Sequence, residues 1–176
     1  MYIPVELERV LFTEDQIQNR VKELGKRLCT EYADKNPLFL CVLRGACVFF
    51  CDLIRAMECP VEIDFIKASS YCGTDSSGEV KLDVSAIPDL TNRDVVVVED
   101  IVDTARTLSL LKTELLKRDP ASLKIVCMLD KPSRRVVKGF KADHVCYEIE
   151  DLFVVGYGLD CDQKFRNLPY IGIYKG

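Results

Sequence analysis

The chain has 176 residues, of which 48% are hydrophobic and 30% charged, and its formal net charge is −4. This length suits one domain with its own core, so we expect a single domain over residues 1–176. The composition excludes a disordered or fibrous protein, and the negative charge disfavours nucleic acid as a partner.

Neither secretion nor a membrane partner is expected. The uncharged apolar runs, such as the one from Ala46 up to Asp52, are far shorter than the roughly 20 residues that a bilayer-spanning helix needs. The first nine residues carry Glu6, Glu8 and Arg9 and lack the basic and apolar regions of a secretory signal. We therefore expect a cytoplasmic protein.

The first half of the chain predicts two helices and two strands. A capping box at Thr13–Gln16 begins a helix whose apolar side chains recur every three or four residues and which ends before Pro37. An apolar strand follows over residues 38–43, and a helix after Gly45 covers residues 46–57. Residues 61–70 alternate as a strand does, and residues 72–81 form a Gly- and Ser-rich loop.

The second half continues the alternation of strands and helices. Four consecutive valines, Val95–Val98, predict a strand buried on both faces. A helix, a strand and another strand are expected over residues 107–117, 123–129 and 144–149. This order predicts an α/β fold, a doubly wound, mostly parallel sheet with flanking helices. Residues 151–176 contain short strand-like pieces broken by glycines and predict a small hood.

The spacing of the nine cysteines and the presence of a single histidine limit which metal or redox sites the chain can form. No two cysteines have the CxxC spacing of redox or zinc sites, and Cys41 and Cys127 lie in apolar runs. We interpret most of the cysteines as buried thiols, with surface thiols or a functional role as the alternatives. His144 opens a strand-like run and is expected to be structural, since one imidazole cannot build a multi-histidine zinc site.

The most unusual residues follow the valine strand. Glu99, Asp100 and Asp103 supply three carboxylates within five residues, and a predicted helix begins after Thr104. Backbone N–H groups at such a helix start can hold a phosphate, and paired carboxylates suit sugar hydroxyls or Mg²⁺. The alternative is a solvated turn capped by threonine. Neither GxxxxGK[ST] nor GxGxxG occurs, which disfavours a P-loop ATPase and a dinucleotide-binding dehydrogenase.

Residues 95–108, VVVVEDIVDTARTL, resemble the phosphoribosyl-diphosphate (PRPP) motif of type I phosphoribosyltransferases. Nearly the whole chain is similar to the 6-oxopurine (hypoxanthine-guanine) branch of that family. The further matching segments occur in the right order and are Val42–Ala46, Ser69–Tyr71, Asp130–Pro132, Phe153–Asp160 and Phe165–Arg166.

The resemblance implies a type I phosphoribosyltransferase fold and a Mg²⁺-dependent transfer of 5-phosphoribosyl from PRPP to N9 of hypoxanthine or guanine. The products are IMP or GMP and pyrophosphate, and use of xanthine is an open alternative. Asp103 is then the catalytic carboxylate beside purine N7, and Glu99 and Asp100 engage the ribose hydroxyls or Mg²⁺. The 5′-phosphate lies against Asp103, Thr104, Ala105, Arg106 and Thr107.

The resemblance also assigns the purine and pyrophosphate ends of the site. Lys131 recognises the 6-oxo group, Phe153 stacks on the base and the main chain of Val154 reads its edge. Asp160 is assigned to the purine-binding residues and also reaches a second Mg²⁺. Pyrophosphate is held by Arg44, Gly45 and Arg166, and Ser70 and Tyr71 belong to a mobile loop. The residues alone leave other interpretations open. Lys131 could be a surface lysine and Phe153 an aromatic residue of the core, and the loop with Ser70 and Tyr71 could have no catalytic part.

Two positions depart from the common family pattern, and one backbone feature is expected. Many members have Gly at the position of Ala105, and Ala fits there if its φ is negative. Many have Lys at the position of Arg44, which keeps the charge but offers a different donor geometry. Members also carry a non-proline cis peptide, which predicts a cis Leu43–Arg44 bond. The family further implies a hood over the purine site and a homodimer or homotetramer.

Two rival functions remain at this point. A receiver-type signalling domain is also doubly wound, carries acidic residues at its strand ends and accepts phosphate on one aspartate. A catalytically silent relative could bind a nucleotide or RNA as a regulator, although Asp103 and the negative charge disfavour it.

Overall fold

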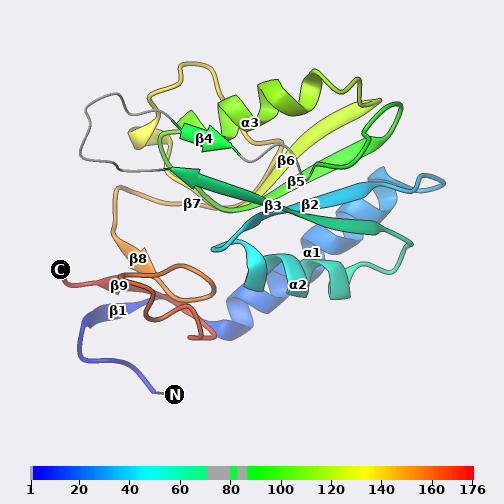
Figure 1. Cartoon of the computed structure of the whole chain (residues 1–176). Helices are drawn as coiled ribbons and strands as arrows, with labels where there is room; N and C mark the ends of the chain where they lie inside the picture. Colours follow the sequence, from blue (N-terminus) through cyan, green and yellow to red (C-terminus); the bar gives the residue numbers. More distant parts are fainter. Residues whose placement is uncertain (1, 71–79, 83–86) are drawn as a thin grey trace.

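The computed structural model describes residues 2–70, 80–82 and 87–176, and its centre is a sheet with helices on both faces (Figure 1). Within these residues the sheet has six strands in the order β4-β3-β2-β5-β6-β7. Neighbours from β3 to β7 run parallel, and β4 pairs antiparallel with β3. Their bounds are β2 Leu38–Leu43, β3 Glu62–Ser70, β4 Val80–Leu82, β5 Asp94–Val102, β6 Ser122–Asp130 and β7 His144–Glu148.

The central strands β2 and β5 are buried because both of their faces are apolar. Leu38 pairs with Val95, and the register continues to Cys41 and Val98. Side chains alternate between the two faces, so Val96 and Val98 join one core cluster while Val95 and Val97 join the other.

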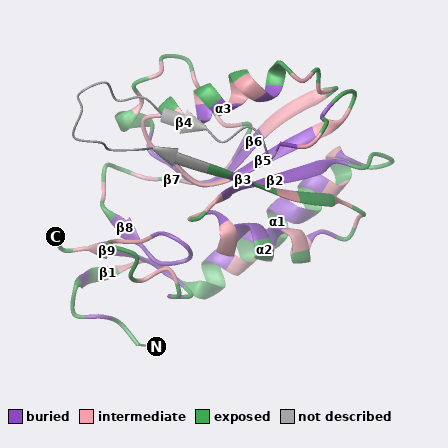
Figure 2. Cartoon of the chain, viewed as in Figure 1, coloured by how far each residue is buried: buried purple, intermediate pink, exposed green. Residues whose placement is uncertain are grey.

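Helices α1 (Glu14–Glu31) and α2 (Cys47–Ala56) cover one face of the sheet, and α3 (Arg106–Leu116) covers the other (Figure 1). The predicted capping box is present, since the Gln16 N–H donates to Thr13 Oγ1 at 3.3 Å and the Thr13 N–H donates to Gln16 Oε1 at 2.9 Å. The helices turn their buried sides toward the sheet (Figure 2). The cores therefore form where the sequence periodicity predicts them.

A small antiparallel sheet forms the hood, and it joins the two ends of the chain. It contains β1 (Leu7–Phe12), β9 (Ile171–Tyr174) and β8 (Val154–Val155), in that order. Strand β1 pairs with β9 from Leu7 opposite Tyr174 to Phe12 opposite Ile171. A 3₁₀ turn, η1 (Pro132–Arg134), follows β6.

The doubly wound α/β fold predicted from the sequence is confirmed, with one difference that matters for the site. Strand β5 extends to Val102, so Glu99 and Asp100 lie within the strand instead of after it. Of the loop expected over residues 72–81, only Val80 and Lys81 are described, and they belong to β4. Among the described residues, no helix is both long and apolar enough to cross a membrane.

The expectation that the cysteines are mostly buried thiols is only partly correct. Cys29 and Cys59 form a disulfide, with Cα atoms 5.7 Å apart and a sequence separation of 30. Cys29 lies near the end of α1 and Cys59 follows α2, so the packing of the two helices brings the sulfurs together. Cys41, Cys127 and Cys146 are buried free thiols, as expected.

Candidate active site

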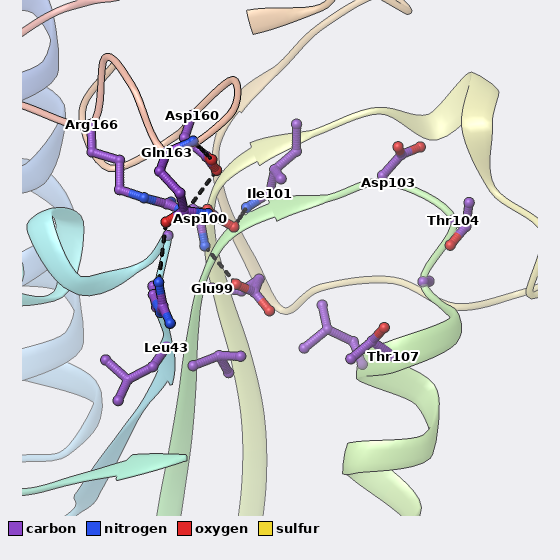
Figure 3. A pocket seen from close by; sticks show the side chains of 15 residues that line it. Leu43, Glu99, Asp100, Ile101, Asp103, Thr104, Thr107, Asp160, Gln163 and Arg166 are labelled. Carbon is purple, nitrogen blue, oxygen red and sulfur yellow. Dashed lines mark hydrogen bonds and ion pairs between the residues drawn. The ribbon is translucent and has the colours of Figure 1, made fainter. Parts of the chain in front are cut away.

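A cavity of about 520 Å³ opens past the carboxyl ends of β2 and β5, where ligands bind in open α/β sheets (Figure 3). It gathers polar groups from three parts of the chain that are far apart in sequence. The lining residues that the sequence had singled out are Arg44, Gly45, Glu99, Asp100, Asp103, Thr104, Ala105, Thr107, Asp160 and Arg166.

Two adjacent carboxylates form the floor of this cavity. The Glu99 side chain accepts a hydrogen bond from the Asp100 N–H at 3.1 Å, and the Asp100 side chain accepts one from the Ile101 N–H at 2.7 Å. Burial, together with the neighbouring charge of Asp100, raises the pKa of Glu99 well above its usual value. Burial also raises the pKa of Asp100, although Arg166 counteracts it. The pair is therefore suited to a cation or to hydroxyl donors.

The loop after β2 packs closely against this carboxylate pair. The Leu43–Arg44 peptide bond is cis, as the family resemblance predicted. A Cβ on Gly45 would lie 1.6 Å from Asp100 Oδ2, and one on Gly158 would lie 2.1 Å from the Gly45 carbonyl oxygen. Only glycine fits at either position, so the loop is pressed between β5 and the segment that follows β8.

The opposite wall of the cavity carries two arginines joined through one glutamine. Arg166 contacts Asp160 Oδ1 at 2.8 Å and donates to the Gly158 carbonyl at 2.7 Å. Gln163 Oε1 accepts from Arg44 at 3.1 Å and from Arg166 at 3.4 Å. Figure 3 shows Arg166 and Gln163 near Asp100, and Arg44 lines the same cavity.

The turn from Asp103 to Thr107 connects β5 to α3 and forms the end of the cavity nearest that helix. Ala105 has φ 64°, in the left-handed region, so the negative φ at which alanine would fit without strain is not found. This conformation favours glycine and costs roughly 1–2 kcal/mol for alanine. The Thr104 hydroxyl accepts from the Arg106 N–H at 3.4 Å. With the start of an eleven-residue helix beside it, the turn can hold an anion.

Asp103 lies at the outer edge of the cavity and its side chain is 40% exposed. Arg134, in η1, contacts it at 3.1 Å between Nε and Oδ1 and also lies 3.6 Å from Asp151. Arg135 donates to the Asp103 carbonyl. The carboxylate is therefore accessible to a ligand, which must compete with Arg134.

Comparison with known proteins identifies the family. Residues 13–162 match the phosphoribosyl transferase domain family. The chain belongs to the phosphoribosyltransferase family. It is 46% identical over 171 residues to a hypoxanthine-guanine phosphoribosyltransferase of Streptococcus thermophilus, covering 97% of this chain and 94% of the relative. A Lactococcus lactis enzyme of the same description is 48% identical over 170 residues, covering 96% and 92%.

Solved structures agree with this assignment. A hypoxanthine-guanine phosphoribosyltransferase from Bacillus anthracis is 41% identical with a TM-score of 0.88, covering 97% of this chain and 99% of the other. A hypoxanthine phosphoribosyltransferase from Staphylococcus aureus is 43% identical with a TM-score of 0.90, covering 97% and 92%. The phosphoribosyltransferase described here is an enzyme of this type, and its sheet, helices and hood match the family fold.

Four other residues assigned from the sequence lie outside the cavity lining of this phosphoribosyltransferase. They are Arg106, Lys131, Phe153 and Val154. Lys131, the residue after β6, is 7% exposed, with Nζ 3.9 Å from Asp151, whereas Phe153 is 56% exposed. Phe153 is therefore not a core aromatic, and Lys131 is not a surface lysine. Tyr71 and the side chain of Ser70 lie outside the described residues.

Gln163 and Arg134 are site residues that the sequence did not indicate. Gln163 links both arginines of the cavity wall, and Arg134 pairs with Asp103. Both are polar residues in irregular segments, where no periodicity marks a role. The arginine pair at residues 134–135, just past a strand end, was the one signal that could have drawn attention.

Proposed function

We propose that this enzyme transfers the 5-phosphoribosyl group of PRPP to N9 of hypoxanthine or guanine, releasing pyrophosphate. The observation that carries the proposal is one cavity in which a carboxylate pair separates an anion-binding turn from a wall of two arginines. PRPP has the same sequence of groups, a 5′-phosphate, a ribose and a pyrophosphate. The named relatives support the purine as acceptor.

Each end of PRPP has a matching part of the cavity. The turn at Asp103–Thr107 offers N–H groups and threonine hydroxyls to the 5′-phosphate. Arg44 and Arg166, with the Gly45 backbone, take the pyrophosphate, since guanidinium groups bind phosphate oxygens through paired hydrogen bonds. Positioning two reactants in line can supply on the order of 7–11 kcal/mol, so no protein nucleophile is required.

Glu99 and Asp100 fit a magnesium ion. Their oxygen-only donors lie side by side, and their raised pKa values reflect a buried acidic pair that a cation stabilises. In the part of the chain that the structure describes, no cluster of three potential metal-ligating side chains occurs, which suits an ion that completes its shell with substrate oxygens. Bound there, Mg²⁺ would neutralise charge on the pyrophosphate. Asp160 is the candidate ligand of a second ion.

Asp103 is proposed as the catalytic carboxylate. Its accessible side chain at the cavity edge allows it to accept a proton from N7 of the base or to stabilise the developing positive charge. Lys131 is proposed to donate to the purine 6-oxo group, and its burial beside Asp151 supports a specific role. Phe153 and Val154, in the hood, are proposed to stack on the base and to read its edge.

The test is a product assay with four bases. Protein, Mg²⁺ and PRPP are mixed separately with hypoxanthine, guanine, xanthine and adenine, and nucleotide formation is followed by absorbance. We expect turnover with hypoxanthine and guanine and none with adenine. The reaction with xanthine decides whether xanthine is also a substrate. Phosphorylation of the protein by a small phosphodonor, without PRPP-dependent pyrophosphate release, would contradict the proposal and favour a receiver-type domain.

The cytoplasmic location, the assembly into a dimer or tetramer and the lack of nucleic-acid and membrane partners stay predictions from the sequence. A loss of activity on addition of a chelator, restored by Mg²⁺, would test the metal requirement directly.

A further inference from the structure

A second pocket, of about 220 Å³, lies between α1 and the edge strand β7. Arg20, Leu24 and Arg27 recur at steps of four and three residues, which places them on one face of α1. His144 and Cys146 are two residues apart in β7, so both face that helix. The full lining is Arg20, Glu23, Leu24, Arg27, His144, Val145 and Cys146.

This pocket is separate from the active site. His144 is the first residue of β7, whereas the active-site cavity lies past the last residues of β2 and β5. In a parallel sheet these are opposite ends, and the two pockets share no lining residue. A ligand bound between α1 and β7 therefore cannot occupy the active site at the same time.

The charge of the second pocket favours an anion. Arg20 donates from Nε to the Cys146 carbonyl at 2.9 Å and contacts Glu23 at 3.2 Å, which fixes its guanidinium against β7. Arg27 has no ion-pair partner among the residues that the structure describes. Two arginines therefore face one glutamate, and the Arg27 guanidinium is free to bind.

His144 supplies a buried polar group beside these arginines. It is 5% exposed, and its Nδ1 has no hydrogen-bond partner among the described residues. Its Nε2 lies 2.9 Å from Glu31 Oε2 without hydrogen-bond geometry, and Lys124 contacts the same glutamate. A buried nitrogen that is left unpaired is costly, and once the ring gains a proton its Nδ1 can donate a hydrogen bond to a bound anion.

We propose that the pocket between α1 and β7 is a second ligand site, which binds the phosphate group of a small anion through Arg20, Arg27 and His144. The pocket exceeds by far the roughly 10–15 Å³ that one water molecule needs. Arginine forks match phosphate oxygens, and an imidazole that gains a proton adds a third charged donor. Free inorganic phosphate and the 5′-phosphate of a nucleotide share this chemistry.

Burial lowers the pKa of His144, and Arg27 and Lys124 lower it further, whereas Glu31 raises it. A bound phosphate adds negative charge beside the ring and therefore raises the pKa of His144. Ligand binding at this pocket and proton binding to His144 are therefore coupled.

His144 is the only histidine of the chain, so the histidine Hε1 region of the NMR spectrum holds a single signal, which is assigned without ambiguity. The experiment follows the His144 Hε1 shift at pH 7 while inorganic phosphate, or adenosine 5′-monophosphate, replaces chloride at constant ionic strength. The wild type is compared with Arg27→Gln and with Lys26→Gln. The latter removes the same charge from the adjacent, exposed position of α1 that does not line the pocket.

We expect a saturable shift, at least about tenfold weaker binding in Arg27→Gln and a change within about twofold in Lys26→Gln. If the shift saturates with inorganic phosphate, the free ion is a sufficient ligand. If it saturates only with the nucleotide, the ligand is a phosphate monoester. A linear response, or a response of equal size in Arg27→Gln, overturns the proposal. The Thr107→Ala variant is altered only in the active-site turn. It should keep the His144 response to phosphate, so binding at this pocket is measured separately from binding at the active site.

Discussion

The backbone of Gly45 packs directly against the carboxylate of Asp100, so closely that a Cβ on Gly45 would lie 1.6 Å from Oδ2. This contact fixes the loop that follows β2 to strand β5, and it sets the position of the carboxylate that faces the cavity. The geometry of the proposed sugar and pyrophosphate subsites therefore depends on one residue without a side chain.

Gly45→Ala is expected to lower kcat/KM for nucleotide formation by about 100-fold, because Asp100 must move by an amount that misplaces the substrate. Steady-state kinetics and thermal unfolding are measured together. Gly139→Ala is the control, since a Cβ there meets nothing within 4 Å; its φ of 78° costs stability but not activity. Full activity of Gly45→Ala would show that the contact is unimportant.

Asp103→Asn is expected to lower kcat by about 100-fold or more while changing PRPP affinity by less than about twofold. The amide keeps the size of the side chain but cannot take the proton or the charge. Single-turnover kinetics measures the chemical step, and calorimetry measures PRPP binding. Equal losses in both would indicate a structural role for Asp103.

Lys131→Ala is expected to reduce the preference for 6-oxopurines over adenine, because it removes the ammonium group that we propose as donor to the 6-oxo group. The measurement is the ratio of kcat/KM values for hypoxanthine and adenine. An unchanged ratio would remove Lys131 from the purine site and leave its pair with Asp151 as its role.

Tyr157→Phe is expected to lower the free energy of unfolding by about 0.5–1.5 kcal/mol, the contribution of one hydrogen bond. The buried Tyr157 hydroxyl donates to Asp52 Oδ2 at 2.8 Å and joins the hood segment to α2. Urea denaturation provides the value. Tyr147→Phe, which removes an exposed bond to the Gln16 carbonyl, should cost less; a larger cost there would contradict this ranking.

His144 is expected to lower the free energy of unfolding in acid. Burial lowers its pKa from the ordinary value of 6.5, so the unfolded chain binds this proton more tightly than the folded one. Stability therefore falls as the pH drops below about 6.5, by at most about 1.4 kcal/mol per pH unit from this group. Denaturation from pH 7.5 to 5, in phosphate-free buffer, should show a steeper decline for the wild type than for His144→Gln. Parallel curves would exclude the effect.

The sequence predicted most of the sheet and helices because their signals are local. The capping box at Thr13 and the valines of β5 each specify an element by periodicity or side-chain shape. Strand β1 was not predicted, because its partner β9 lies at the other end of the chain and β1 has one buried residue, Leu7. The Cys29–Cys59 disulfide likewise depends on helix packing, which spacing does not reveal.

The candidate site was predicted through a resemblance, and the details that escaped prediction are tertiary. The positive φ of Ala105 contradicts the preference of alanine, so no propensity could indicate it. Gln163 and Arg134 act through contacts with Arg44 and Asp103, residues that are 119 and 31 positions away. Such pairs are visible only once the fold has brought them together.

The most direct test is a crystal structure of the enzyme with Mg²⁺ and PRPP. We predict the 5′-phosphate against the N–H groups of the Asp103–Thr107 turn, the ribose beside Glu99 and Asp100, and the pyrophosphate between Arg44 and Arg166. PRPP bound elsewhere, or bound in the reverse orientation with pyrophosphate at the turn, would contradict the account.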